Sequence, residues 1–312
     1  MTSNFDELFG TETEKSGNEQ KSDGKTRTKL LHEARNECYA MVENACIDAI
    51  SAPTKLTMLL DVESRFSLYS LNNNLLIYAQ KPYAIRFKNF DGWKKEGGIV
   101  KAGSKAFMIL EPHEYTGNDG EKHIAYNPKK VFDVSDVTFR GRDQSLEQPK
   151  PYDARALLTA LLNNSSIPVR KAEPEKTPPI GAESAYYDNK DHCVYYRQDG
   201  KGIAYAFPAI ALALAHAEMA KTHGENYRAD RCAFQARCAA YVLSEKYGVP
   251  TDTVRIDSIP PRCANMSPDE IKGELLEIHS IVKSIDARMR DFFLDMEYEK
   301  SSGDRRIDGG AR

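Results

Sequence analysis

The sequence predicts an α+β protein in two domains, a small mixed helix and sheet domain followed by a mainly helical one, with loose tails at both ends. The chain has 312 residues, a length that usually holds about two domains. With 41% apolar and 29% charged residues, it can bury a core and remain soluble. A polar, proline-bearing stretch at 140–151 separates two differently patterned halves. We therefore place domains at 29–140 and 150–299, and disordered tails at 1–28 and 300–312.

The N-terminal tail is rich in Glu, Lys, Ser, Gly and Thr, a composition typical of disorder. Within it, Phe5, Leu8 and Phe9 stand beside acidic residues. Such an acidic-aromatic segment, Phe5–Phe9, could dock in a groove of a protein partner. Incidental apolar residues in a loose tail are the simpler interpretation.

The first domain begins with three predicted helices. In residues 29–50, apolar side chains recur at helical spacing, and Ser51-Ala52-Pro53-Thr54 ends that helix and caps the next. Two more helices are expected at 55–67 and 70–80. Strands follow, with turns at Gly97-Gly98 and Gly103 and a hairpin loop at Asn118-Asp119-Gly120; the strands are expected at 84–87, 99–101, 106–111 and 130–134.

The second domain is predicted to be mainly helical. The expected elements are a helix at 154–162, a strand at 169–172, a hairpin around Asn189-Lys190-Asp191, and helices at 207–222, 227–247 and 268–298.

We expect a cytoplasmic protein with no membrane partner. The N-terminal residues contain no apolar leader. The most apolar stretch, 203–220, contains Pro208, His216 and Glu218, so we expect it to be too short and too polar to span a bilayer. Six cysteines without a C-x-x-C pair favour free thiols in a reducing compartment.

Positive charge and aromatic rings are concentrated in residues 81–110. The whole chain has a net charge of −3, but this stretch holds seven Lys or Arg against two acids, an excess of five. Single-stranded nucleic acid is bound by such a mixture, because cations follow the phosphates and rings stack on bases. Composition alone favours the alternative of a solvated strand face over an aromatic core. The interleaved rings are Tyr83, Phe87, Phe90, Trp93 and Phe107.

Three consecutive asparagines, residues 72–74, stand in the predicted helix 70–80 beside an apolar stripe. Asparagine is a poor helix former, so the run suggests side chains retained for hydrogen bonding. A cap where the helix restarts would explain one asparagine, but not three.

Several blocks occur in a recognisable order between residues 35 and 138. They are Arg65-Phe66, Tyr69-Ser70, Asn73, Leu75-Leu76-Ile77, Ala79-Gln80, Pro82, Trp93-Lys94, Gly97-Gly98, Val100-Lys101, Gly103, Lys105-Ala106, Leu110, Pro112 and Val131–Thr138. Together they resemble the N-terminal domain of ArdC-type antirestriction proteins, in the form common on conjugative elements of Gram-positive bacteria. The resemblance implies a single-stranded-DNA-binding domain that protects incoming DNA of a mobile element. Leu71 and Asn72 stand where family members often carry an aromatic residue and an Arg, a departure that bears on affinity more than on fold.

From the residues and this resemblance we assign roles as a hypothesis. Trp93 and Tyr69 stack on bases, and Asn73 and Gln80 make polar contacts or brace the loop. The phosphates are held by Arg65, Arg86, Lys94, Lys101 and Lys105.

The second half resembles the zinc peptidase domain that follows in ArdC-type proteins. That domain carries H-E-x-x-H on one helix, where two His bind zinc and the Glu activates water. If His216 is the second His, Leu212 replaces the first, Ala213 replaces the Glu, and the third ligand falls near Ala233. The resemblance therefore implies a zincin-like fold without metal, cofactor or catalytic residues, with His216 as a vestigial position.

Two other arrangements remain open. His216 and His223 with Cys232 and Cys238 could form an improvised metal site, although their spacing matches no ordinary ligand pattern. Glu218 could replace the missing base, although it faces away from His216 on a helix. The alternatives to a DNA-binding pseudoenzyme are thus an active zinc metallopeptidase with an atypical ligand set, or a protein-interaction scaffold.

Overall fold

The computed structural model describes residues 24–117, 119–139, 152–163, 165, 167–172, 184–197, 200 and 202–308, with side chains from Thr28 to Tyr298. The chain forms two compact units. Unit 1 contains Met1–Ile50 and Tyr69–Glu147, and unit 2 contains Ser51–Leu68 and Gln148–Arg312. The predicted first domain at 29–140 is therefore wrong in one respect: the segment Ser51–Leu68 belongs to unit 2. The segments Phe5–Phe9 and 140–151 lie outside the described residues.

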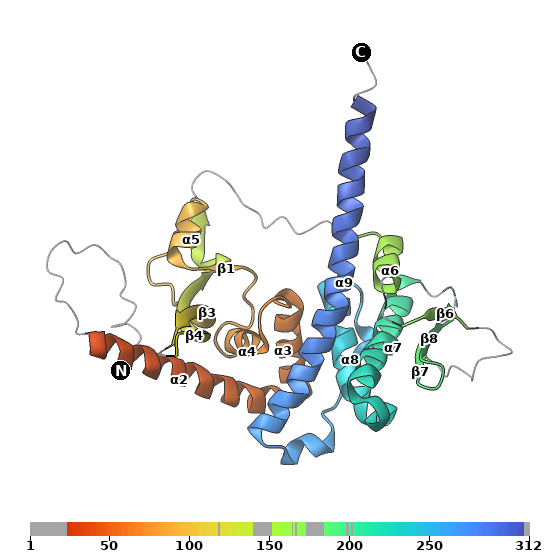
Figure 1. The fold of residues 1–312 in the computed structure, drawn as a ribbon, viewed down its shortest axis with the longest axis horizontal. Coiled ribbons are helices and arrows are strands. Elements are labelled where there is room, and N and C mark those ends of the chain that lie inside the picture. Colours follow the sequence, from red (N-terminus) through yellow and green to blue (C-terminus); the bar gives the residue numbers. More distant parts are fainter. Residues whose placement is uncertain are drawn as a thin grey trace. The chain divides into compact units, whose positions relative to one another are not determined.

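Unit 1 has two main helices, α2 (Gly24–Ala49) and α4 (Leu71–Gln80). One face of α2 buries apolar residues four positions apart, including Ala34, Cys38 and Val42, and packs against α4 and the sheet (Figure 1). The side chain of Ser70 accepts a hydrogen bond from the Asn73 amide and caps the start of α4.

A three-stranded antiparallel sheet and a smaller two-stranded sheet complete unit 1. The larger sheet has the order β1-β4-β3, with β1 at Phe87–Lys88, β3 at Phe107–Thr116 and β4 at Lys122–Asp133. The smaller sheet pairs β2 (Gly98–Val100) with β5 (Val137–Phe139). A one-turn 3-10 helix, η1 (Val134–Asp136), joins β4 to β5, and a short helix, α5 (Phe90–Lys95), precedes β2. The sequence did not predict α5 or β5.

The β3–β4 hairpin confirms the predicted turn, because Thr116 pairs with Lys122 across it and Gly120 has a left-handed φ of 77°. Both strands are longer than expected, since β3 is exposed from Glu111 onward and carries no apolar alternation there.

Unit 2 is mainly helical. It contains α3 (Pro53–Arg65), α6 (Ala154–Leu162), α7 (Ile203–His223), α8 (Ala229–Lys246) and α9 (Pro268–Asp308). Packing against α8 accounts for the assignment of α3 to this unit. Short 3-10 helices lie at Gly224–Asn226, Asp252–Val254 and Pro261–Asn265.

A long apolar stripe explains α9. Its buried residues Ile271, Leu275, Ile278, Val282 and Ile285 follow helical spacing and face α8. A capping box starts the helix, because the Ser267 amide donates to the Glu270 carboxylate over 2.8 Å and the Ser267 hydroxyl accepts from the Glu270 amide over 3.3 Å. The helix is described as far as Asp308, and the predicted tail at 300–312 begins within its last turns.

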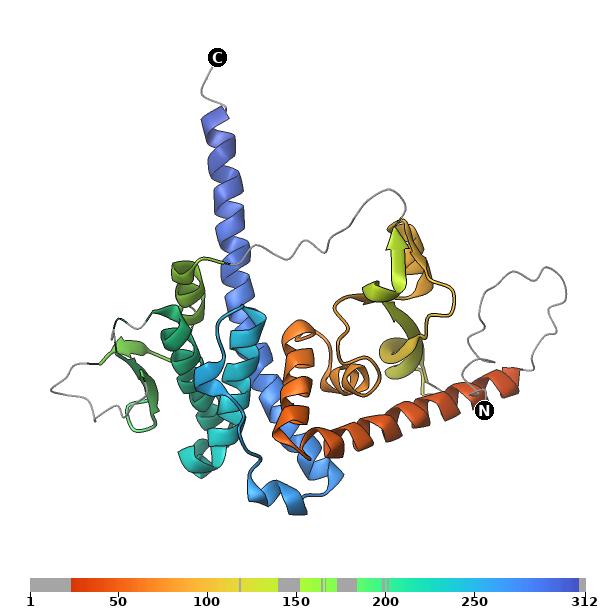
Figure 2. The ribbon, with the colours of Figure 1, turned by 180° about the vertical axis from the view of Figure 1, so that it is seen from behind.

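The remaining sheet of unit 2 has the order β6-β8-β7, with β6 (Val169–Lys171) parallel to β8 (Cys193–Tyr196) and β7 (Ala185–Asp188) antiparallel to it. The antiparallel pair confirms the predicted hairpin around residues 189–191. Figure 2 shows this sheet beside α7.

The helix Ile203–Asn226 is long and apolar enough to cross a membrane by length and composition, contrary to the sequence-based expectation. Because 56% of its most apolar window is buried inside the structure, it resembles the core helix of a folded domain. All six cysteines are free and buried, as the sequence predicts for thiols.

Candidate nucleic-acid interface

A short segment of unit 1, Phe132–Asp136, holds three cationic segments together. The indole Nε1 of Trp93, from α5, donates to the Phe132 carbonyl over 2.8 Å. The Arg86 carbonyl accepts from the Val134 amide over 2.8 Å, and the Lys101 amide donates to the Asp136 carbonyl over 2.8 Å. Residues 81–88, α5 and the 101–105 turn therefore converge on one hub, which we call the 132–136 hub.

Asp133 is the buried centre of the hub. Its side chain accepts from the amides of Ile85, Arg86 and Ser135 at 2.8, 3.2 and 3.0 Å, and the residue is 1% exposed. Burial raises the pKa of this carboxyl, but its hydrogen bonds from Ser135 and the two backbone amides outweigh that effect and lower the pKa. The ionised carboxylate thus fixes the loop that carries Arg86.

Two lysines are tied to η1 in different ways. Lys81 Nζ lies 2.8 Å from Asp136 Oδ2 and forms an ion pair. Lys101 Nζ donates to the neutral Ser135 carbonyl over 2.8 Å and keeps its charge uncompensated by that contact. The excess counted from residues 81–110 is therefore reduced by an acid outside that stretch, which only the fold brings near.

Glu96, which caps the C-terminal end of α5, binds two further cations. Lys88 Nζ donates to one carboxylate oxygen, and Arg86 Nη2 lies 3.8 Å from the other. The Arg86 guanidinium also lies over the Trp93 ring, 5.0 Å from its centroid.

Of the lysines in residues 81–110, four have no acidic partner among described residues. Three of them, Lys94, Lys95 and Lys105, are exposed, and their side chains make no hydrogen bond or ion pair with described residues. Together with Lys101 they occupy α5 and the turn between β2 and β3, and α5 packs against β2. We call these residues the lysine cluster: Lys94, Lys95, Lys101 and Lys105.

The predicted stacking of Trp93 on bases is wrong for this structure. The side chain is 0% exposed, its ring packs edge-on against Phe139 at 6.1 Å, and its only polar atom is bonded to the hub. Trp93 instead supports Arg86. Tyr69 is 36% exposed, and its ring packs on Phe87 with the ring centroids 5.0 Å apart.

The structure exposes two further rings, one in the loop before α5 and one at the first residue of α5. Tyr83 is 77% exposed and Phe90 is 44% exposed. We assigned no role to either ring from the sequence, where Pro82, which marks a loop just before Tyr83, was the available signal.

Asn73 and Gln80 brace the fold and do not face a ligand. The Asn73 side-chain amide donates to the Leu110 carbonyl over 2.9 Å and accepts from the Leu110 amide over 2.7 Å. Gln80 makes the same double contact with Met108, at 3.0 and 2.9 Å. The two amides lie two turns apart on α4 and pair with alternate residues of β3, whose outer edge has no strand beside it. Of their two predicted roles, bracing is the one that the geometry supports.

Arg65 is the last residue of α3 and therefore belongs to unit 2. It is exposed and its charge acts on Glu245 of α8, whose pKa is raised by burial and by Asp61 and lowered by Arg65. Arg65 is not part of the hub.

In unit 2, helix α7, where the resemblance places the metal-binding motif, lacks the side chains that bind a metal. Leu212 and Ala213 supply no ligand, and Ala233 is exposed on α8. His216 Nδ1 lies 3.0 Å from the Tyr227 hydroxyl, and burial lowers its pKa to about 4. A neutral imidazole held by a tyrosine is a structural contact.

The two alternative arrangements are also excluded by geometry. Glu218 forms an ion pair with Arg288 at 2.8 Å, so it is not positioned as a base. Among residues that the structure describes, no group of three His, Cys, Asp or Glu side chains could hold a metal ion. The donor set therefore does not fit a metal.

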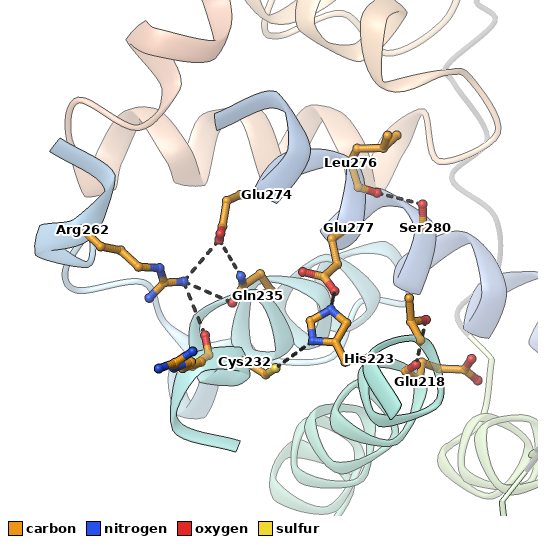
Figure 3. A network of polar contacts seen from close by, with 11 residues as sticks. Glu218, His223, Cys232, Gln235, Arg262, Glu274, Leu276, Glu277 and Ser280 are labelled. Atoms are coloured by element: carbon orange, nitrogen blue, oxygen red, sulfur yellow. Dashed lines mark hydrogen bonds and ion pairs between the residues drawn. The ribbon is translucent and has the colours of Figure 1, made fainter. Parts of the chain in front are cut away.

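His223 lies instead in a polar cluster that joins α7, α8 and α9 (Figure 3). Its Nε2 is 2.6 Å from Glu277 Oε1 and its Nδ1 is 3.8 Å from Cys232 Sγ. Beside it, Glu274 binds both Gln235 and Arg262.

This order of thiol, imidazole and carboxylate is that of a thiol nucleophile with its base. However, Cys232 is 3% exposed, and burial together with the charge of Glu277 raises its pKa. The thiol is therefore neutral and shielded, and the cluster fastens three helices.

No family model matches this sequence, and no curated protein matches it. Two solved structures of the antirestriction protein ArdC from plasmid R388 are similar. The Mn(II)-bound structure has a TM-score of 0.50 and 13% identity, and the alignment covers 80% of this chain and 97% of that one. The metal-free structure has a TM-score of 0.44 and 15% identity over 72% and 86%. The likeness to the Mn(II)-bound structure shows that this chain has an ArdC-like fold.

Proposed function

We propose that unit 1 binds single-stranded DNA without strong sequence preference, and that the protein serves antirestriction in the cytoplasm by protecting transferred DNA of a mobile element. The observation that carries this proposal is the convergence of cationic segments on the 132–136 hub, with the lysine cluster left without acidic partners among described residues. The fold supports the antirestriction role, since the solved structures with this fold are antirestriction ArdC proteins.

Single strands suit such a surface for two physical reasons. Lysines that neutralise phosphates release counterions, which drives binding at low salt. Exposed rings stack on any base and contribute roughly 1–3 kcal/mol each. Tyr83 and Phe90 take the stacking role that the buried Trp93 cannot, and Tyr69 is partly exposed beside them in sequence.

A competition assay between single-stranded and duplex DNA tests the proposal. A fluorescent mixed-sequence oligonucleotide is titrated with the full chain, and single-stranded or duplex DNA of the same sequence then displaces it. Bases in a duplex cannot reach the rings, so the duplex should compete on the order of tenfold more weakly, the equivalent of one lost stack. Oligothymidylate should compete as well as the mixed strand. Equal competition by duplex and single strand would refute the stacking part of the proposal.

We propose that unit 2 is a metallopeptidase-like domain without catalysis, retained as a surface for a protein partner, as is the segment Phe5–Phe9. The Mn(II)-bound structure with this fold makes manganese the natural test ion. Because the H-E-x-x-H positions hold Leu212, Ala213 and His216, millimolar Mn(II) or Zn(II) should leave the melting temperature unchanged by calorimetry. A specific rise that a chelator reverses would favour the active metallopeptidase instead.

A further inference from the structure

We propose that Arg86 and Lys88 form a phosphate subsite of the strand-binding surface, and that the carboxylate of Glu96 fills this subsite until a nucleic-acid phosphate displaces it. This inference rests on the proposed function and adds its regulation. It assigns Glu96 the role of an internal competitor for the incoming strand.

The geometry of Glu96 resembles that of a bound phosphate. Each carboxylate oxygen faces one cation, Lys88 Nζ in hydrogen-bonding contact and Arg86 Nη2 at 3.8 Å. The side chains of Arg86, Lys88 and Glu96 are 42%, 36% and 36% exposed. An anion from solvent can therefore reach both cations without unfolding, and the carboxylate can swing out toward water.

The fold fixes the backbones of both cationic residues and the guanidinium of Arg86. Arg86 lies over the buried Trp93 ring, and its backbone is fixed by Asp133 and Val134 of the hub. Its Nε is buried and has no hydrogen-bond partner among described atoms, and its outer Nη2 faces the Glu96 carboxylate. Lys88 belongs to β1 and pairs with Phe132 of β4. The subsite should therefore persist when Glu96 leaves it.

Glu96 is held mainly by these cations. A carboxylate at the C-terminal end of a helix is disfavoured by the helix dipole. The hydrogen bond from Lys88 lowers the pKa of Glu96 more than burial raises it, and the charges of Lys88 and Arg86 lower it further. An ionised Glu96 thus competes with any single anion. A strand that brings several phosphates to the lysine cluster at once can overcome this competition, which favours polyanions over isolated ions.

The variant Glu96→Gln tests the subsite by removing the competing charge. With a single-stranded oligonucleotide, it should bind several-fold more tightly than the wild type. The slope of log K against log salt should steepen by about 0.7, because one further phosphate is neutralised at the freed subsite. The matched control is Asp91→Asn, which removes the same charge from an exposed residue in the first turn of α5 that has no described partner. Its affinity should stay within twofold of the wild type.

A double variant tests whether the gain in affinity arises at the cations that Glu96 contacts. Lys88→Gln combined with Glu96→Gln should lose most of the gain, because one of the two freed cations is gone. An equal gain in Glu96→Gln and Asp91→Asn, or no gain in the former, would overturn the subsite and leave the strand-binding function standing.

A separate measurement keeps the subsite testable if the protein binds no oligonucleotide, a result that would end the proposed function. Inorganic pyrophosphate should then raise the melting temperature of Glu96→Gln more than that of the wild type or of Asp91→Asn. Equal shifts in the three proteins would refute the subsite.

Discussion

Replacing Asn73 with alanine is expected to destabilise unit 1 by about 2–4 kcal/mol, because two buried backbone groups lose their only partner at roughly 1–3 kcal/mol each. The side chain pairs with both the amide and the carbonyl of Leu110, and this part of β3 is buried. Alanine supplies neither a donor nor an acceptor, and the space that it leaves is too enclosed for ready hydration.

The measurement is urea unfolding of the full chain followed by tryptophan fluorescence. The protein has a single tryptophan, and Trp93 is buried in unit 1, so the signal reports the unfolding of that unit. The matched control is Asn72→Ala, one residue earlier on the same helix, which makes no hydrogen bond with described residues. It should change stability by less than about 0.5 kcal/mol, and alanine's helix propensity favours a small gain. If both variants unfold at the same urea concentration, Asn73 does not brace β3.

Replacing Lys94, Lys101 and Lys105 together with glutamine is expected to weaken single-strand binding on the order of 100-fold near 0.1 M salt. Each phosphate contact contributes roughly 0.7 to the slope of log K against log salt, so the loss of three contacts lowers that slope by about 2. At 0.1 M salt this corresponds to about two powers of ten in the binding constant. The side chains of Lys94 and Lys105 make no hydrogen bond or ion pair with described residues, and the side chain of Lys101 donates to a backbone carbonyl, so the fold should be unaffected.

The control removes positive charge from exposed lysines of unit 2, with Lys221→Gln and Lys283→Gln. Those changes should leave affinity within about twofold, because these lysines belong to the other unit and not to the lysine cluster. An equal loss in both proteins would mean that net charge, and not the lysine cluster, determines binding.

The helices could be predicted from sequence because their apolar periodicity survives in the fold. The stripe of α9 and the Ser267–Glu270 cap are local features, and so is the turn at Gly120. The placement of α3 is not local, since it depends on a face that packs on α8, far along the chain. Periodicity shows that a face is buried, but not which helix covers it.

The candidate site was harder to predict, because each correction comes from a long-range contact. Asp136 pairs with Lys81 from 55 positions away, so the charge count over residues 81–110 does not include it. The resemblance identified Val131–Thr138 as a motif, but only the hydrogen bonds of Asp133 show that this motif organises the loop of Arg86. The sequence around Trp93 looks the same whether the ring stacks on DNA or supports an arginine. The burial of the side chain decides between these two roles.

The salt dependence of oligonucleotide binding tests the convergence of these cations most directly. We predict that log K for the wild type falls linearly with log salt between 50 and 300 mM, with a slope of about −2 to −3 for three or four phosphate contacts. The triple-lysine variant should be nearly insensitive to salt over the same range. Binding by the wild type that does not change with salt, or that has the same slope in the triple-lysine variant, would contradict the account.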